Sequence, residues 1–249
     1  MRTIIIIPAR YSSSRFPGKV LAGICGKPLI QHIFEQAKKV CLAEDIIVAT
    51  DDKRISDEVS SFGGKSVFTS PDHKTGSDRI AEVAEKEKCD IIINLQGDEI
   101  LVYPDMVNEL ISLFLEDKTL EMGTIKRKIV KREDIYNHNI VKVVTDKQGY
   151  ALYFSRSPIP FMRDINSYDL SQQKYYQHIG IYGYKRDFIL KFNSLPLSFL
   201  EEAEKLEQLR ALENGYKIKV IETKGESLRI DVPEDLIIAE ELMGSILNK

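Results

Sequence analysis

Four polar clusters in this 249-residue sequence contain side chains that could bind charged substrates. The first, at residues 10–19, combines the cations Arg10, Arg15 and Lys19 with three consecutive serines and Gly18. Backbone N–H groups and hydroxyls can donate hydrogen bonds to phosphate oxygens while cations neutralise the charge, so this segment suits a polyphosphate. It lacks the GxxxxGK[ST] spacing of a Walker loop, and a solvated loop explains the residue types equally well.

Two further clusters contain carboxylates, at residues 96–99 and 230–235. A carboxylate such as Asp98, beside a glycine at a strand end, can hold a divalent metal against phosphate oxygens. A turn in which Asp98 bonds nearby backbone N–H groups explains it too. Asp231 is expected to cap the next helix, with Pro233 near its first turn. Only a pairing of Asp231 with Asp98 would give Asp231 a role beyond that cap.

The fourth cluster lies in the second half of the chain and comprises Arg156, His178, Tyr182, Glu207 and Gln208. A lone histidine in an aromatic strand is typical of a packed core group, and Glu207 and Gln208 fit the wet side of a helix. Neither an HExxH nor a GxSxG motif occurs, so the residues do not support zinc hydrolysis or acyl transfer.

The elements that must position these clusters alternate along the first half of the chain. Short apolar runs predict buried strands, and amphipathic segments between them predict helices. The predicted strands are 3–9, 46–50, 65–69 and 90–95. Such alternation indicates βαβ units and a parallel sheet with helices on both faces. Ligands bind outside the carboxyl ends of strands in such sheets, where all four clusters fall.

After the helix that begins at Pro104, the pattern changes. Residues 140–145 and 150–155 flank a turn and predict an antiparallel hairpin. The remaining predicted elements are strands at 177–184, 217–221 and 228–231, one helix carrying Leu200, Ala203, Leu206, Leu209 and Leu212, and a final helix from Pro233. No linker or repeat separates this half from the first, so we expect one domain over residues 1–249.

Composition excludes several classes of protein. Hydrophobic residues make up 43% and charged residues 29%, which is unlike disordered or collagen-like chains. Net charge is −3, which argues against coating nucleic acid or an anionic membrane. The apolar run Ile4–Ala9 is too short to span a bilayer. Cys25, Cys41 and Cys89 show no CxxC spacing, which favours reduced thiols. We expect a cytoplasmic protein without nucleic-acid or membrane partners.

Seven segments taken together resemble the bacterial CMP-sugar synthetases, and the last three narrow the resemblance to the 3-deoxy-manno-octulosonate (Kdo) cytidylyltransferases. In chain order they are IPARYSSSRFPGK (7–19), VATD (48–51), TGSDR (75–79), NLQGDE (94–99), YALYFSR (150–156), HIGIYGY (178–184) and LEQLR (206–210). The similarity runs from about residue 3 to 236.

This resemblance implies a GT-A-like nucleotidyltransferase fold, in which a mixed, mostly parallel sheet carries helices on both faces. It also implies a homodimer, and the transfer of CMP from CTP to Kdo with release of pyrophosphate, for lipopolysaccharide synthesis. Residues 1–127 would mainly bind CTP, 128–222 the sugar and a second subunit, and 223–249 would return to the main sheet with a metal aspartate.

The resemblance also implies site residues. Lys19, Asp98 and Asp231 would be catalytic, and the two aspartates would bind Mg²⁺. The nucleotide would be bound by Arg10, Ser13, Lys19, Ser77 and Arg79. The acidic eight-carbon sugar would be bound by Gln96, Arg156, His178, Tyr182, Glu207 and Gln208.

Three residues depart from the family pattern. Ile100 stands where proline is usual, Arg229 where glycine or a small residue is common, and Val232 where threonine is frequent. Arg229 would salt-bridge Asp231, assist the triphosphate or face solvent. Alternatives are a cytidylyltransferase for 8-amino-Kdo or a sialic-acid-type sugar, a non-catalytic CTP-binding regulator and a glycosyltransferase. The presence of both aspartates argues against the regulator, and the 10–19 loop argues against a diphosphate-sugar donor.

Overall fold

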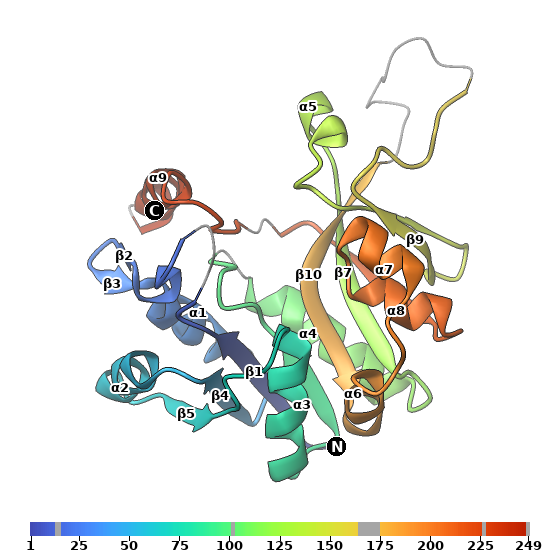
Figure 1. The fold of residues 1–249 in the computed structure, drawn as a ribbon. Coiled ribbons are helices and arrows are strands. Elements are labelled where there is room, and N and C mark those ends of the chain that lie inside the picture. Colours follow the sequence, from blue (N-terminus) through green and yellow to red (C-terminus); the bar gives the residue numbers. More distant parts are fainter. Residues whose placement is uncertain (13–15, 101–102, 164–174, 226–227, 248–249) are drawn as a thin grey trace.

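A mixed β-sheet with helices on both faces forms the body of the protein (Figure 1). This computed structural model describes residues 1–12, 16–100, 103–163, 175–225 and 228–247, with side chains described as far as residue 243. The strands of the main sheet are β1 (Thr3–Ala9), β4 (Asp45–Thr50), β5 (Lys65–Phe68), β6 (Ile91–Asn94), β7 (Met122–Lys128), β8 (Lys142–Thr145), β9 (Ala151–Ser155), β10 (Tyr176–Lys185) and β11 (Ile218–Thr223). A separate hairpin pairs β2 (Gly23–Ile24) with β3 (Lys27–Pro28).

The strand order is β11-β7-β10-β6-β1-β4-β5, and the β8–β9 hairpin is attached through β10. Strand β10 runs antiparallel to β6 and β7, whereas β1 pairs in parallel with β4 and β6. The predicted mixed, mostly parallel sheet and the hairpin over residues 140–155 are therefore confirmed. Strand β7 was not predicted, because Gly123 and the cations at 126–128 interrupt its apolar pattern.

Most of the helices cover the two faces of the sheet in two groups. The helices of the described chain are α1 (Leu29–Ala37), α2 (Lys53–Ser61), α3 (Gly76–Lys86), α4 (Pro104–Glu116), α5 (Arg132–Tyr136), α6 (Arg186–Phe192), α7 (Phe199–Glu204), α8 (Gln208–Glu213), α9 (Asp235–Leu247) and the 3₁₀ turn η1 (Lys19–Leu21). Helices α1, α2, α4 and α9 pack on one face, and α3, α6, α7 and α8 on the other. Among the described residues, no helix is long and apolar enough to cross a bilayer.

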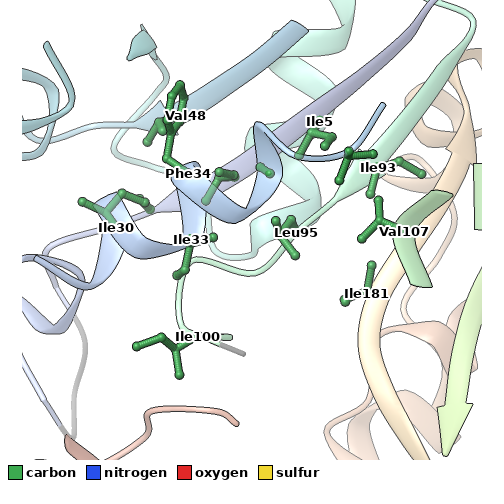
Figure 2. Close-up of a cluster of buried hydrophobic side chains, with 14 of the residues drawn as sticks. Ile5, Ile30, Ile33, Phe34, Val48, Ile93, Leu95, Ile100, Val107 and Ile181 are labelled. Atoms are coloured by element: carbon green, nitrogen blue, oxygen red, sulfur yellow. The ribbon is translucent and has the colours of Figure 1, made fainter. Parts of the chain in front are cut away.

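The uninterrupted apolar sequence of β1 follows from its burial on both faces. Because successive strand side chains point to opposite faces, Ile5 and Ile7 join the cluster under α1, while Ile4 and Ile6 join the cluster under α3. Figure 2 shows the first cluster, in which Ile5 lies near Ile93 of the neighbouring strand. The two clusters hold the central strands firmly, so their carboxyl ends provide a rigid edge for polar loops.

Two predicted elements differ from the structure. The helix predicted over residues 200–212 is two helices, because Lys205 takes a left-handed conformation (φ 54°) between α7 and α8. The leucine spacing continues across this break, so the sequence carries no sign of it. A buried ion pair joins the two helices, with Arg210 Nη2 at 2.5 Å from Glu201 Oε1. The predicted strand 228–231 is reduced to a single bridge between Arg229 and Glu99, and the last helix begins at Asp235 rather than Pro233.

Candidate active site

Two adjoining cavities, of about 420 Å³ and 660 Å³, lie at the carboxyl ends of β1 and β6. Helix α9 and the β2–β3 hairpin lie on one side of this edge, and α5 with β9 on the other (Figure 1). Both cavities are lined by Gly76, Gln96, Lys205, Glu207, Arg229 and Asp231. Groups bound in the two cavities would therefore meet along this shared boundary.

Residues far apart in the sequence form a charged cluster in the first cavity. Lys19 Nζ lies 2.6 Å from Asp98 Oδ2 and 3.7 Å from Asp231 Oδ1. Lys19 also donates a hydrogen bond of 3.0 Å to the Ile230 carbonyl. The two aspartates are thus paired through a shared cation, which is the arrangement that gives Asp231 a role beyond a helix cap.

The segment that leads into α9 is held by the Asp235 carboxylate. It accepts hydrogen bonds from the backbone N–H groups of Asp231 and Val232, at 2.7 and 3.0 Å. The Asp231 carboxylate itself contacts Lys19, so its role is not limited to the helix end. The sequence pattern Asp-x-Pro fits a cap equally well, so only the three-dimensional arrangement separates the two roles.

Asp98 is buried yet negatively charged. Burial raises the pKa of its carboxyl, but the charges and hydrogen bonds of Arg229 and Lys19 outweigh burial and hold that pKa below its usual value. Its Oδ1 atom is buried and accepts no hydrogen bond. A buried carboxylate oxygen without a donor is a ready ligand for a hard divalent cation.

The carboxylates of Asp98 and Asp231 would therefore suit a hard divalent cation such as Mg²⁺. Across the described ranges, no group of three or more His, Cys, Asp or Glu side chains is arranged to hold a metal. Two carboxylates leave most of an octahedral shell to water and substrate oxygens, which is typical of Mg²⁺ sites that also bind phosphates.

Gly97 permits the close packing that places Asp98. A Cβ atom at this position would lie 2.7 Å from the Pro8 carbonyl oxygen at the end of β1. Only glycine fits without a backbone shift, so the loop after β6 can pass directly over β1 toward Lys19.

The remaining predicted nucleotide-binding residues have different surroundings. Arg10 lines the first cavity, and Ser13 lies outside the described residues. Arg79 also lines it, but the guanidinium is buried and donates to Asp51 Oδ2 and Thr69 Oγ1, each at 2.6 Å. Arg79 thus ties α3 to the ends of β4 and β5. Ser77 lines the second cavity rather than the first.

All six predicted sugar-binding residues line the second cavity: Gln96, Arg156, His178, Tyr182, Glu207 and Gln208. Arg156 is held by three carbonyl acceptors, with Nε at 2.8 Å from Glu204 O, Nη1 at 3.0 Å from His138 O and Nη2 at 3.5 Å from Lys205 O. These bonds leave part of the five-donor guanidinium fork available to a ligand carboxylate.

The break between α7 and α8 places Glu207 and Gln208 in the cavity wall. Ser77 Oγ donates a 2.5 Å hydrogen bond to Glu207 Oε2, and burial raises the pKa of the Glu207 carboxyl. The Nε2 atom of Gln208 is buried and has no acceptor. A bound ligand oxygen would provide that acceptor, because a buried amide donor without a partner is costly.

His178 is a neutral, hydrogen-bonded group rather than a proton donor to substrate. Burial lowers the pKa of its imidazole to about 3. Its Nε2 lies 2.9 Å from Thr124 Oγ1, and its ring lies 5.3 Å from that of Tyr182. His178 and Tyr182 are four residues apart on β10, so both side chains point to the same face of the strand and line the same cavity.

Several residues in or behind the cavity walls were not predicted as site residues. Lys142 is fully buried, and its Nζ donates to the carbonyls of Asn137, Ile140 and Arg156, which are all lining residues. Burial lowers the Lys142 pKa to about 8. Arg127 adds a cation to the second cavity, and Lys205 and Arg229 add cations to both. Arg229 was visible in the sequence only as a departure from a family pattern.

A mixed sheet with charged cavities at its strand ends is typical of α/β proteins that bind charged ligands. Comparison with known proteins narrows this class. Residues 4–219 match the cytidylyltransferase family. The chain is 51% identical to a 3-deoxy-manno-octulosonate cytidylyltransferase from Trichlorobacter lovleyi, covering 98% of this chain and 99% of that protein. It is 50% identical to the same enzyme from Geobacter sulfurreducens, covering 95% and 97%.

A solved structure agrees with both relatives. A CMP:2-keto-3-deoxy-manno-octonic acid synthetase in complex with CTP superposes with a TM-score of 0.92 at 41% identity, covering 98% of this chain and 99% of the other. The chain therefore belongs to the cytidylyltransferase family and, within it, to the 3-deoxy-manno-octulosonate cytidylyltransferases.

The burial of His178 has a measurable consequence. Because its pKa is about 3 in the folded chain and 6.5 in the unfolded chain, the imidazole contributes stability that is complete above pH 6.5 and is lost as the pH falls toward 3. In ¹H–¹³C NMR spectra we expect the His178 ring signal to stay constant from pH 7.5 to about 4.5 and to titrate only in urea. A midpoint near 6.5 in the folded protein would contradict this prediction.

Proposed function

We propose that the protein transfers CMP from CTP to the anomeric hydroxyl of Kdo, giving CMP-Kdo and pyrophosphate for lipopolysaccharide synthesis. The observation that carries this proposal is the pair of cavities that meet at Asp231, Gln96 and Glu207, beside the cluster of Lys19 and Asp98. A reaction that joins two anionic substrates needs adjoining pockets with cations at their boundary. Family membership supports the same reaction.

We assign CTP to the first cavity and the sugar acid to the second. Arg10 and Lys19 line the first cavity and supply positive charge for the triphosphate. The second cavity is larger and more varied in its donors, with Arg156 for the sugar carboxylate and Gln208 Nε2 for a hydroxyl. This assignment follows the proposed division into a nucleotide part (1–127), a sugar and dimer part (128–222) and a returning segment (223–249) within one domain.

The chain contributes position and charge to this transfer rather than a covalent nucleophile. The anomeric oxygen must lie in line with the bond between the α-phosphorus and the leaving pyrophosphate. Gln96 and Glu207, at the shared boundary, are placed to orient the sugar there. Lys19 stabilises negative charge on the departing phosphates, since its ammonium is already fixed in the cavity by Asp98.

Mg²⁺ held by Asp98 and Asp231 would supply Lewis-acid polarisation of phosphate oxygens and lower the pKa of a bound hydroxyl. The neutral imidazole of His178 packs beside the Tyr182 ring and is hydrogen-bonded to the Thr124 hydroxyl. Through these contacts His178 shapes the sugar cavity. Arg79, which is tied to Asp51, positions the N-terminus of α3 beneath the first cavity.

We also propose a cytoplasmic homodimer. Val130, Tyr136 and Phe161 are 72, 44 and 80% exposed, and each is next in sequence to a buried or partly buried residue of a small cluster beside α5. Large apolar side chains grouped in this way favour a protein partner over water. Sedimentation velocity at micromolar concentration should give the mass of a dimer, and a monomer under those conditions would contradict the proposal.

Pyrophosphate release tests the proposed reaction directly. With Mg²⁺ we expect release from CTP and Kdo, and none when UTP replaces CTP. Parallel assays with 8-amino-Kdo and N-acetylneuraminate separate the sugar alternatives, because the transfer chemistry is common to all three. Preference for the amino sugar would change the assigned acceptor, and no release with any acceptor despite CTP binding would favour a regulator.

Asp98→Asn is expected to lower kcat by about 10²–10³-fold, because it removes one charged ligand from the site of developing charge. Circular dichroism should remain unchanged, since the amide has the same shape as the carboxylate. Asp105→Asn, on the exposed start of α4, is the matched control and should retain activity. Full activity of Asp98→Asn at saturating Mg²⁺ would overturn the assignment of this aspartate.

A further inference from the structure

Arg229 lies against both aspartates at the boundary of the two cavities. Its Nε and Nη2 atoms each lie 3.3 Å from Asp98 Oδ2, and its Nε lies 3.4 Å from Asp231 Oδ1. The interpretation that it salt-bridges Asp231 is confirmed, and it contacts Asp98 as well. Two cations, Lys19 and Arg229, therefore face two carboxylates.

The two cations are held differently. The Lys19 side chain is 13% exposed, and its ammonium lies 2.6 Å from Asp98 and bonds the Ile230 carbonyl. The Arg229 side chain is 58% exposed, and its closest carboxylate distance is 3.3 Å. An exposed pair at a longer distance is weaker, because water screens it and the long side chain keeps other rotamers. Lys19 is the fixed cation, and Arg229 is the one that can leave.

The backbone near Arg229 is held in place by a second unusual residue. The Ile100 N–H donates a 2.8 Å hydrogen bond to the Leu228 carbonyl, and the Ile230 N–H donates a 2.8 Å bond to the Asp98 carbonyl. Proline at position 100 would have no N–H and could not make the first of these bonds. The two bonds hold the residues on either side of Arg229, so the backbone of Arg229 has a defined place in this chain.

We propose that Arg229 is an exchangeable counter-ion for the aspartate pair. Its guanidinium neutralises Asp98 and Asp231 while they hold no divalent cation, and a divalent cation must displace it to bind. The displaced guanidinium stays at the cavity boundary, where it meets the anionic groups of either substrate. This proposal rests on the proposed function for the identity of the metal site, but the competition itself requires no turnover.

Binding of Mn²⁺ to the metal-free, nucleotide-free protein, followed by electron paramagnetic resonance, tests the competition. Arg229→Gln should bind Mn²⁺ about fivefold more tightly than the unaltered protein, because an ion pair worth about 1 kcal/mol no longer opposes the metal. Arg229→Lys keeps the charge but has one nitrogen in place of a fork, so its affinity should fall between the two.

Lys74→Gln is the matched control for charge. Lys74 is exposed and lines the first cavity, but no described contact joins it to the aspartates. It should change Mn²⁺ affinity by less than twofold. An equal gain in Mn²⁺ affinity in Lys74→Gln would mean that the total positive charge of the cavity causes the effect, which would overturn the proposal. Arg229 variants that bind Mn²⁺ no more tightly than the unaltered protein would overturn it too.

The two proposals can fail separately. Arg229→Gln could bind Mn²⁺ more tightly while the unaltered protein forms no CMP-Kdo. That result would support the counter-ion role of Arg229 and contradict the proposed reaction. Conversely, the unaltered protein could form CMP-Kdo while both Arg229 variants show unchanged Mn²⁺ affinity. That result would support the proposed reaction and contradict the counter-ion role. Circular dichroism of both variants excludes misfolding as the cause of either result.

Discussion

The ion pair between Lys19 and Asp98 is the contact that makes a site from separate pieces of chain. Lys19 belongs to the segment after β1, and Asp98 belongs to the loop after β6. Lys19 also donates a hydrogen bond to the carbonyl of Ile230, which belongs to the returning segment. A buried carboxylate costs several kcal/mol unless it is paired, so this contact is expected to hold all three segments at one edge of the sheet. The same geometry leaves the buried Asp98 Oδ1 atom without a hydrogen-bond donor.

That contact depends on a rigid support. Residues of β1 are buried on both faces, and the loop after β6 can cross the end of β1 only because Gly97 has no side chain. Each fully buried isoleucine contributes about 1.5–3 kcal/mol, so the central strands resist the small displacements that would separate Lys19 from Asp98. The charges lie in loops, but the strands on which the loops depend are among the most deeply packed parts of the molecule.

Sequence reasoning identified the strands and the polar clusters because both have local patterns. The apolar runs of β1, β4 and β6 and the strand-end positions of Lys19 and Asp98 are visible without coordinates. The break at Lys205 was missed because a non-glycine residue takes a left-handed conformation inside an unbroken leucine spacing. The orientation of Asp231 was missed for a different reason. A helix cap and a cavity ligand use the same residue type at the same position, and only the contact with Lys19, more than 200 residues away in the sequence, reveals the second role.

The charge balance of the cavities also constrains how the substrates can be accommodated. A cavity that must receive a triphosphate and a sugar acid needs positive charge, yet unopposed cations in a confined space repel one another. Pairing Lys19 and Arg229 with Asp98 and Asp231 balances the charges of these four groups. If a divalent cation then binds the two carboxylates, the displaced guanidinium of Arg229 is left at the boundary of the two cavities, where the anionic groups of the two substrates meet. The exposed position of Arg229 and the fixed position of Lys19 are therefore complementary. Lys19 keeps the segments of the site together, and Arg229 supplies positive charge when the negatively charged substrates bind.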